Sequence, residues 1–502
     1  MTDEVRLNDK SAGNYLPTTR EIVGFVTIFL SMILVFYVNR VMAFKYLAML
    51  FLAIMAFMSN KKFVWIAIFW VIVDSVGGLF TERAIGETAV GIPIINIASG
   101  ISIGIKDLLI LAMIFSVTPK NRYNKINYDH LLFFGMLFFA TFIGSVFYDA
   151  SYKIIVSVLI RGYIIFLLYY TIRNEFKIQT LFQLFHLISY LVPIILIDQI
   201  FQVVFGTRII TRYVSVELKM MVNTFTGETR AVSFGMNTLF FSFVYGLLLL
   251  TIRRTQDMKI ASYFYGILLV IMTITSVMLS ATRGVIGVFG IILLFVSPYL
   301  VLKMRNIAIV LGVIFFLLNL LGGFGLNLDY FYRNTIVRVM STVAPAIAGA
   351  GFSEIDTSGR NTELPEIIEG IRRSPIVGYG ISNNLFDYYN SNFGGLNTII
   401  QFGLFGAALI LVVLILWIFK LFRLCRHLPY QSIYQSTGRV TYAVLVGMMA
   451  GYLTTYNYFT SFFAYDVLRL ILVMFMSYLV FHNAREIIYS NQLSGELAVA
   501  KA

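Results

Sequence analysis

Residues 393–419 read FGGLNTIIQFGLFGAALILVVLILWIF, a run of 27 residues without one charged side chain. An α-helix rises about 1.5 Å per residue, so roughly 20 apolar residues cross the hydrocarbon core of a bilayer. This run is therefore predicted to be a membrane-spanning helix. Similar runs recur along the whole chain, and together they decide the fold class.

The composition also indicates a membrane protein. Of the 502 residues, 59% are hydrophobic and only 13% are charged, whereas soluble domains contain about 25% charged residues. We expect one all-α integral-membrane domain over residues 1–502, with about 14 transmembrane helices and no soluble domain attached. The predicted spans lie near residues 21–38, 42–58, 63–80, 101–118, 131–148, 153–172, 180–205, 235–252, 259–279, 284–302, 306–323, 393–419, 438–457 and 461–481.

The charges of the connecting segments predict which side each one faces. With the N-terminus in the cytoplasm, the inner segments hold 21 Lys and Arg, counting Lys259 and Arg439 at span edges. The five short outer loops hold only 4. Because Lys and Arg collect in short cytoplasmic loops, both termini are predicted to be cytoplasmic. The first 20 residues are polar, so no cleavable signal peptide is expected and the first span acts as the uncleaved signal.

Two predicted outer loops are long: residues 206–237 and residues 324–392, the latter 69 residues in length. Long loops are exempt from the charge rule because they translocate largely regardless of charge. Their arginines are either a solvated face or a cationic surface that meets an anionic substrate at the membrane. The basic residues are Arg208, Arg212, Lys219 and Arg230 in the first loop, and Arg333, Arg338, Arg360, Arg372 and Arg373 in the second.

The remaining composition limits the chemistry. A net charge of +13 suggests nucleic acid in a soluble protein, but here it is explained by topology, and no nucleic-acid partner is expected. Cys425 is the single cysteine, which excludes an intramolecular disulfide and a cysteine-based metal site. The histidines are scattered, so neither a metal nor another cofactor is expected. They are His130, His186, His427 and His482.

A few ionisable residues fall inside the predicted spans. Such residues usually face the bundle interior and pair with one another. Lys106 with Asp107 and Asp466 with Arg469 are close enough in sequence to neutralise each other. His186 is interpreted as a packed core histidine rather than a proton relay. The others are Asp74, Arg161 and Asp198.

Arg283 stands in a minimal outer turn, Leu279-Ser280-Ala281-Thr282-Arg283-Gly284, between two spans. A cation in so apolar a background is exceptional. Its guanidinium offers a planar fork that matches phosphate oxygens in two parallel hydrogen bonds. The alternative is an arginine that only anchors the helix at the lipid headgroups.

The large loop contains one predicted helix, Thr362–Arg373, with an apolar stripe at i, i+3, i+4 and i+7. Ser374-Pro375 is expected to end it. The helix is predicted to lie along the outer membrane interface with its apolar side towards the lipid. Arg360 is predicted to lie just before its N-terminus, where free N–H groups favour anions. Gly378-Tyr379-Gly380 then either allows the backbone to approach a ligand or forms a simple turn. The stripe consists of Leu364, Ile367, Ile368 and Ile371.

Together these segments resemble the bacterial O-antigen polymerase and O-antigen ligase superfamily of membrane glycosyltransferases. Thr282-Arg283-Gly284 is similar to the family's Ser-Arg-Gly at the outer end of a helix. The further similar stretches are Gly359-Arg360 with Ser374-Pro375-Ile376-Val377-Gly378-Tyr379-Gly380, Leu396-Asn397 with Gly403-Leu404-Phe405-Gly406, and Gly227-Glu228-Thr229-Arg230 up to Asn237.

One departure separates the two branches of this superfamily. The ligases carry a histidine before the asparagine, where this chain has Leu396, and neither long outer loop contains a histidine. The resemblance therefore implies a polymerase of undecaprenyl-pyrophosphate-linked repeat units, which builds O-antigen or a related surface polysaccharide at the outer face of the inner membrane. An O-antigen ligase and a lipid-linked oligosaccharide flippase or other transporter are the alternatives.

The resemblance, together with the charges, gives expected roles to named residues. Arg283 and Arg230 are expected to clamp the pyrophosphate, with Arg360 as a partner carried by the loop. Asp356 or Glu363, which flank Arg360, is the candidate for deprotonating the acceptor. The expected partners are the lipid-linked glycan, membrane lipid, a chain-length regulator and a flippase. Further candidate substrate-binding residues are Arg208, Arg212, Arg372, Arg373, Tyr379 and Asn397.

Overall fold

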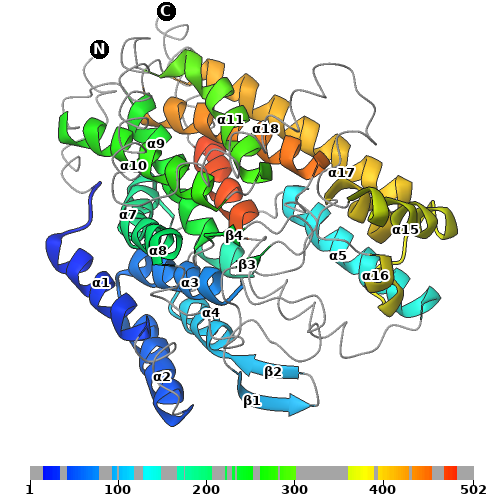
Figure 1. Cartoon of the computed structure of the whole chain (residues 1–502), viewed down its shortest axis with the longest axis horizontal. Coiled ribbons are helices and arrows are strands. Elements are labelled where there is room, and N and C mark those ends of the chain that lie inside the picture. The colour runs from blue at the N-terminus through cyan, green and yellow to red at the C-terminus, as the bar shows by residue number, and fades with distance from the viewer. Residues whose placement is uncertain are drawn as a thin grey trace, which may run out of the picture.

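The computed structural model of the chain describes residues 15–33, 42–77, 93–98, 101–117, 128–148, 167–173, 176–205, 221–222, 229–231, 235–252, 260–280, 283–300, 360–388, 394–428, 432–454 and 468–482. This part of the chain is mainly helical (Figure 1), in agreement with the predicted class. The helices are α1 (Thr19–Ile33), α2 (Met42–Met58), α3 (Lys62–Gly77), α4 (Ile105–Phe115), α5 (Tyr128–Phe147), α7 (Ile178–Ser189), α8 (Val192–Phe205), α9 (Met236–Thr251), α10 (Ile260–Leu279), α11 (Arg283–Val296), the 3₁₀ turn η4 (Ser297–Tyr299), α15 (Arg360–Arg373), α16 (Asn383–Tyr388), α17 (Gly394–His427), α18 (Ile433–Thr454) and a C-terminal helix (Leu468–His482).

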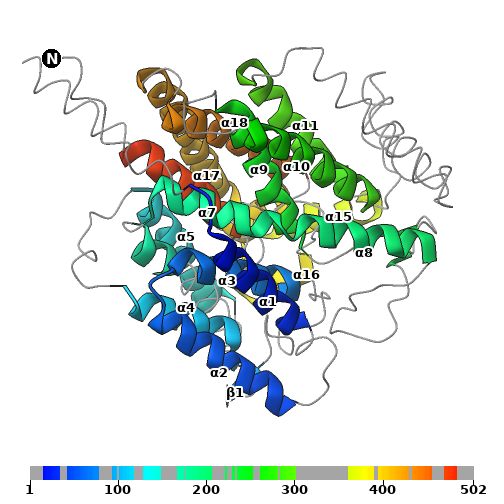
Figure 2. The same cartoon turned by 90° about the vertical axis from the view of Figure 1, so that its left-hand side faces the viewer.

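Three of the described helical segments are long and apolar enough to cross a membrane: Ile178–Gln202, Ser262–Leu279 and Gly394–His427. The first of these combines α7 and α8, which follow each other across the molecule in Figure 2. Shorter apolar helices occur at Lys62–Val71, Asn237–Thr251, Gly284–Tyr299 and Leu468–His482. These helices support membrane association. The predicted span at residues 306–323 lies outside the described residues.

Two short antiparallel hairpins accompany the helices. Strand β1 (Pro93–Ala98) pairs with β2 (Ile101–Gly104), and β3 (Met221–Val222) pairs with β4 (Thr229–Arg230). The first hairpin corrects the span predicted at residues 101–118, because β2 occupies its start and α4 is only 11 residues long. The apolar run fits either structure, since apolar periodicity alone does not separate a strand from a buried helix.

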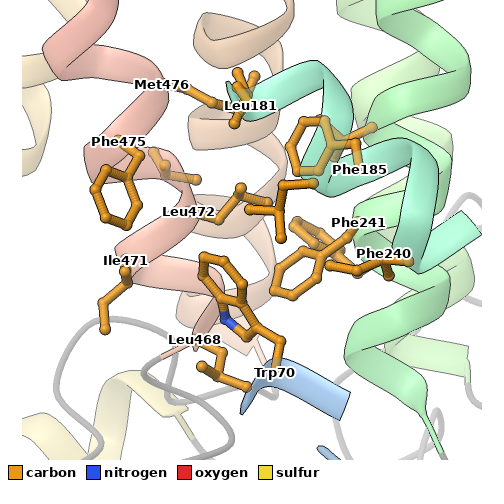
Figure 3. Close-up of a cluster of buried hydrophobic side chains, with 14 of the residues drawn as sticks. Trp70, Leu181, Phe185, Phe240, Phe241, Leu468, Ile471, Leu472, Phe475 and Met476 are labelled. Carbon is orange, nitrogen blue, oxygen red and sulfur yellow. The ribbon is translucent and has the colours of Figure 1, made fainter. Parts of the chain in front are cut away.

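Helix α9 forms the centre of the described core, and all its side chains from Asn237 to Leu250 are buried. Figure 3 shows the apolar cluster that joins it to α3 and the C-terminal helix. The ring of Trp70 lies 5.6 Å from that of Phe241 and 6.5 Å from that of Phe475, both nearly edge to face. Aromatic rings in this arrangement stabilise a core beyond the burial of their area.

Several helices contact one another at ends that the predicted alternation of spans assigns to the same side of the membrane. On the predicted inner side, the Ser436 hydroxyl donates to the Thr251 carbonyl at 3.3 Å, and the Arg439 guanidinium lies 4.4 Å from the Tyr299 ring. On the predicted outer side, the Tyr452 hydroxyl of α18 donates to Thr398 of α17 at 2.5 Å. The contacts show which helix ends lie together, and the side of the membrane that each end faces stays a prediction.

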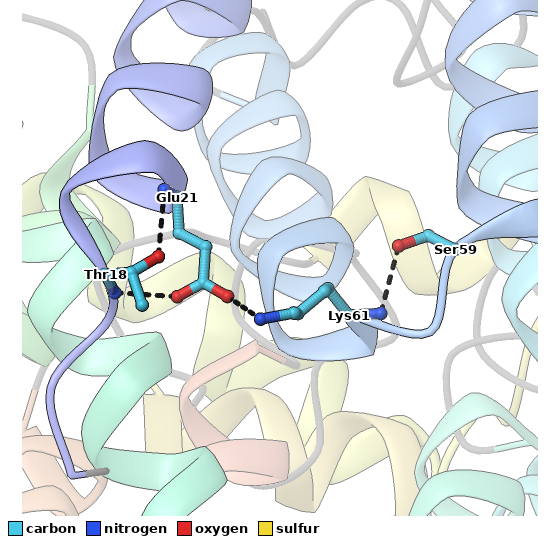
Figure 4. A network of polar contacts seen from close by, with 4 residues as sticks. All are labelled: Thr18, Glu21, Ser59 and Lys61. Carbon is cyan, nitrogen blue, oxygen red and sulfur yellow. Dashed lines mark hydrogen bonds and ion pairs between the residues drawn. The ribbon is translucent and has the colours of Figure 1, made fainter. Parts of the chain in front are cut away.

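The start of α1 is tied to the turn before α3 (Figure 4). The Thr18 N–H donates to Glu21 Oε2 at 2.7 Å and the Glu21 N–H donates to Thr18 Oγ1 at 3.4 Å. This reciprocal pair is a capping box, which satisfies two N–H groups at the start of a helix. The other Glu21 oxygen accepts from the Lys61 ammonium. Both elements belong to the predicted inner side.

Candidate functional site

The structure brings together the two chain segments that carry Arg230 and Arg283. Arg230 ends β4, and the next residue, Ala231, is fully buried against Leu279 at the end of α10. Arg283 follows Leu279 by four residues and is the first residue of α11. The segments are far apart in sequence, yet Ala231 and Leu279, one and four residues from the two arginines, pack in one cluster.

Gln199 of α8 fixes this arrangement. Its amide nitrogen donates to the Ala231 carbonyl at 3.1 Å, and its amide oxygen accepts a hydrogen bond from the Ser276 hydroxyl of α10. Gln199 and Ser276 are fully buried. Since a buried polar group is costly without partners, these bonds hold β4, α8 and α10 to one another.

Arg469 is a further arginine, and it contacts the first turns of α9, the helix that follows β4 in the chain. It lies in the first turn of the C-terminal helix and is buried. Its Nε donates to Asn237 Oδ1 of α9 at 2.5 Å, and its guanidinium carbon is 5.4 Å from the Phe240 ring. From the sequence, Arg469 is expected to pair with Asp466, which lies outside the described residues. Only its position within a predicted span marked Arg469 as unusual.

These contacts place positive charge at the N-terminus of α9. The chain enters α9 from β4 through Gly235, which has a φ of +85°. A helix N-terminus presents free N–H groups and a partial positive charge, and both favour an anion. Arg469 and the start of α9 therefore form a cationic region, and the backbone of Arg230 in β4 precedes the same helix N-terminus.

The loop after α15 docks onto a break in α17. Within α17, Gly403 has a φ of 68° and a ψ of 179°, which interrupts the helix. The Tyr379 N–H donates to the Ile400 carbonyl at 2.8 Å, and the Gly380 N–H donates to the Gln401 carbonyl at 2.9 Å. In the opposite direction, the Leu404 N–H donates to Pro375 at 2.8 Å. We call the contact between residues 375–381 and the α17 break the glycine joint.

Glycines make this close approach possible. Gly378 and Gly380 have φ values of 68° and 62°, a backbone conformation that glycine adopts without steric cost. A Cβ on Gly380 would lie 2.3 Å from the Ala140 carbonyl oxygen of α5. The backbone that these glycines approach is thus that of α5 and α17. The turn itself lies at residues 375–377, just before Gly378-Tyr379-Gly380, and the approach of this stretch to a ligand stays a prediction.

Tyr379 lies inside the glycine joint. Its hydroxyl donates to the Gly370 carbonyl at 3.1 Å, and its ring lies 4.9 Å from that of Tyr148 and 5.4 Å from that of Tyr388. Burial, with a contribution from the neighbouring Tyr388 and Tyr148 hydroxyls, raises the pKa of Tyr379 to about 12. Tyr379 is therefore a neutral packing residue in this conformation, and its predicted role in substrate binding remains a prediction.

Helix α15 ends at Arg373, as Ser374-Pro375 predicted, but it begins at Arg360 instead of after it. Its apolar face packs inward on protein: Ile367 is buried with Tyr379 and Ile400. Ile368 departs from the predicted stripe, because it is 39% exposed.

The polar face of α15 is exposed, as predicted. Arg372 and Arg373 both lie on the surface. Arg373 Nε forms an ion pair with Glu369 Oε1 at 3.0 Å, and its guanidinium carbon is 6.0 Å from the Tyr388 ring. Arg372 and Arg373 therefore present two cations at the C-terminal end of α15.

For the other predicted site residues, the structure gives at most their burial or their position in a helix. Asn397 is completely buried near the start of α17. Glu363 lies in the first turn of α15. Asp356, Arg208 and Arg212 lie outside the described residues.

Neither His186 nor the acidic side chains form a metal site in the described part of the chain. The two ring nitrogens of His186 lie 3.1 Å from the hydroxyls of Tyr245 and Tyr190, as expected for a packed histidine. Among the described residues there is no group of three His, Cys, Asp or Glu side chains that could hold a metal ion.

Comparison of the chain with protein-family models and with curated proteins found no match.

Proposed function

We propose that this chain is a membrane glycosyltransferase that polymerises undecaprenyl-pyrophosphate-linked repeat units into O-antigen or a related surface polysaccharide. The observation that carries the proposal is the packing of Ala231 on Leu279. This contact joins the segments of Arg230 and Arg283, the two residues expected to clamp a pyrophosphate. Arg469 adds a guanidinium at the start of α9.

The proposed reaction needs a site of this kind. An acceptor hydroxyl attacks the anomeric carbon of the donor, a new C–O bond forms, and the lipid pyrophosphate leaves with the electron pair of the broken bond. The negative charge that develops on the leaving group is stabilised by preorganised donors. Arginine is suited to this role because its fork binds two phosphate oxygens and stays charged.

The arrangement of the helices supports a reaction on one side of the membrane. The residues around α9, the glycine joint and the α10–α11 turn all belong to the predicted outer ends. In the proposal, the glycine joint holds α15 on this side, with Arg360 at its N-terminus. We place the protein in the bacterial inner membrane with cytoplasmic termini, and expect a flippase to supply donors and a chain-length regulator to act on the product.

The break in α17 is the observation that favours the flippase alternative, because transporters often bind their substrates at broken helices. In this chain the joint already occupies the backbone groups at the break: the carbonyls of Ile400 and Gln401 accept from the loop, and the Leu404 N–H donates to it. Backbone groups satisfied within the protein are not available to coordinate a transported ligand. This favours the enzyme over the transporter.

The ligase alternative differs from the polymerase in its acceptor. Leu396 stands where the similar ligases carry histidine, and it packs against the apolar cluster around Tyr379. His186 is held by tyrosines inside the helix bundle. We therefore favour the polymerase.

A defined reaction mixture tests the proposal. Purified protein in liposomes receives undecaprenyl-pyrophosphate-linked repeat units and no other acceptor. A polymerase has donor and acceptor in this mixture and produces a ladder of products spaced by one repeat. A ligase produces nothing until a separate acceptor is added, and a flippase moves the lipid without lengthening it. Either of the last two results contradicts the proposal.

A further inference from the structure

The exposed apolar side chains of α17 form one strip along the helix. The strip begins at Leu404, directly after the break at Gly403, and ends at Phe419, directly before Lys420. Its members recur three or four residues apart and so share one face. Only 33% of the most apolar stretch of α17 is buried within the protein, so this face is available to lipid. Between its ends the strip includes Phe405, Leu409, Val412, Ile415 and Leu416.

The two ends of the strip obtain their positive charge from different elements. At one end, α17 itself continues into a cationic segment that begins with Lys420. At the other end, residues 394–403 of α17 contain no charged side chain. The glycine joint brings cations to that end, because it docks the C-terminal end of α15, with Arg372 and Arg373, onto α17 (Figure 1).

Ile376 extends the apolar strip past the break in α17. Its carbonyl accepts a hydrogen bond from the Phe405 N–H at 3.4 Å, and the Pro375 carbonyl accepts one from the Leu404 N–H at 2.8 Å. These bonds join the two backbones, but the side chains of Ile376, Leu404 and Phe405 are each more than half exposed. Apolar side chains that are exposed together on a docked loop are typical of a surface that contacts an apolar partner.

The exposed surface of α15 is divided into two sides. On one side, Glu369 forms an ion pair with Arg373 at 3.0 Å. On the other side, Ile368 and Arg372 lie four residues apart, and residues at this spacing are neighbours on a helix surface. Both are exposed. Arg372 therefore lies between two exposed isoleucines, Ile368 on α15 and Ile376 in the joint.

We propose that Ile368, Arg372, Ile376, Leu404 and Phe405 form a binding surface for an anionic phospholipid, and we call it the lipid patch. Its apolar side chains contact the acyl chains, and its guanidinium binds the headgroup phosphate through two parallel hydrogen bonds. An arginine can lay its apolar stem along such a surface while its charge stays among the headgroups. Charge complementarity selects an anionic lipid over a zwitterionic one.

The lipid patch differs from the membrane contact predicted for α15. The predicted contact used the apolar stripe of that helix, but Ile367 of the stripe packs on protein. In the lipid patch, the contact comes from the one stripe residue that departs from this packing, Ile368, and from the joint and α17. The inference does not depend on the proposed reaction.

The first measurement tests whether the patch lies in the bilayer. Full-length protein with Cys425→Ala and Ile376→Cys is labelled with an environment-sensitive fluorophore and reconstituted into phosphatidylcholine vesicles. We expect quenching by lipids brominated near the headgroup, and protection from iodide present on both sides of the vesicles. Glu366→Cys is the matched control, because Glu366 is exposed on the acidic side of α15 and a label there should be quenched by iodide. Equal iodide quenching at both positions contradicts the proposal.

The second measurement tests the preference for an anionic lipid. The label at position 376 is quenched by a minor fraction of brominated phosphatidylglycerol or by the same fraction of brominated phosphatidylcholine. We expect about fivefold higher occupancy by phosphatidylglycerol, the preference that one arginine gives near a membrane surface. The preference should disappear in Arg372→Gln and at ~1 M salt, where charges are screened within about 3 Å. Arg423→Gln, which changes an exposed cation at the other end of α17, should leave it unchanged.

Three results would overturn the proposal. The first is equal quenching by the two lipids when Arg372 is present. The second is a phosphatidylglycerol preference that persists in Arg372→Gln or at high salt. The third is loss of the preference when undecaprenyl pyrophosphate is added in amounts far below those of phosphatidylglycerol, because the patch would then belong to the proposed substrate. A protein that shows the preference but forms no ladder keeps the lipid patch and loses the proposed function.

Discussion

Gly403→Ala tests the glycine joint, because the substitution changes one atom at the point where the loop meets α17. A Cβ at this position would lie 1.9 Å from the Ile376 carbonyl oxygen and 2.5 Å from the Val377 nitrogen. Both are backbone atoms, which cannot rotate away. The backbone angles of Gly403 also fall in a region that is essentially restricted to glycine. We expect the variant to open the joint.

The size of the effect follows from two contributions. The backbone strain costs about 1–3 kcal/mol in a residue with a Cβ. If the loop moves away instead, the hydrogen bonds from Leu404 to Pro375 and from Phe405 to Ile376 are lost, at about 0.5–1.5 kcal/mol each. Either route destabilises the docked loop by about 1–3 kcal/mol, which increases the open population roughly 5- to 150-fold.

Cysteine labelling measures this opening. Ser382 is fully buried beside the joint, and its hydroxyl has no hydrogen-bond partner within the described structure, so Ser382→Cys is a mild substitution. In a Cys425→Ala background, a maleimide should label Cys at position 382 about 5- to 150-fold faster when Gly403→Ala is present. Gly135→Ala is the control, because a Cβ there meets nothing within 4 Å. Equal labelling rates in the Gly403→Ala and Gly135→Ala proteins would refute the reasoning.

Two further predictions concern the site and the topology. Arg283→Ala should abolish ladder formation at unchanged membrane abundance, and Arg283→Lys should lose most activity because an ammonium cannot bind two phosphate oxygens as a fork; full activity of the lysine variant would mean that Arg283 is only an anchor. In intact cells, impermeant reagents should label a cysteine at Ser358 but not one at Asn60, and the reverse pattern would overturn the predicted orientation.

The sequence predicted the elements whose signals are local. Residues 42–58 form α2 at the predicted positions, because an apolar run of this length has one stable form in a bilayer. Helix α15 ends before Ser374-Pro375 for an equally local reason: the proline ring disfavours the helical conformation of the preceding residue. Where the local signal was ambiguous, at residues 101–104, the prediction of a helix was wrong.

The sequence also identified Arg230 and Arg283 as candidates, since a charge in an apolar chain is visible without a structure. The sequence did not show that their segments lie together. After Ala231 the chain crosses the bundle as α9 and returns as α10, and only then does Leu279 pack on Ala231. The bonds of Gln199 to Ala231 and Ser276 that fix this proximity depend on packing between helices distant in sequence. Only the tertiary structure contains this information.

The glycine joint shows the same division in a single motif. The sequence showed that Gly378 and Gly380 permit a close approach, because a residue without Cβ adopts positive φ at no steric cost. The sequence contained no indication of which part of the chain lies against these two glycines. The structure supplies the backbone of Gly403 and Ala140, since hydrogen bonds between a loop and a broken helix form only after both have packed. Local chemistry thus determined which residues are permissive, and long-range packing decided what they contact.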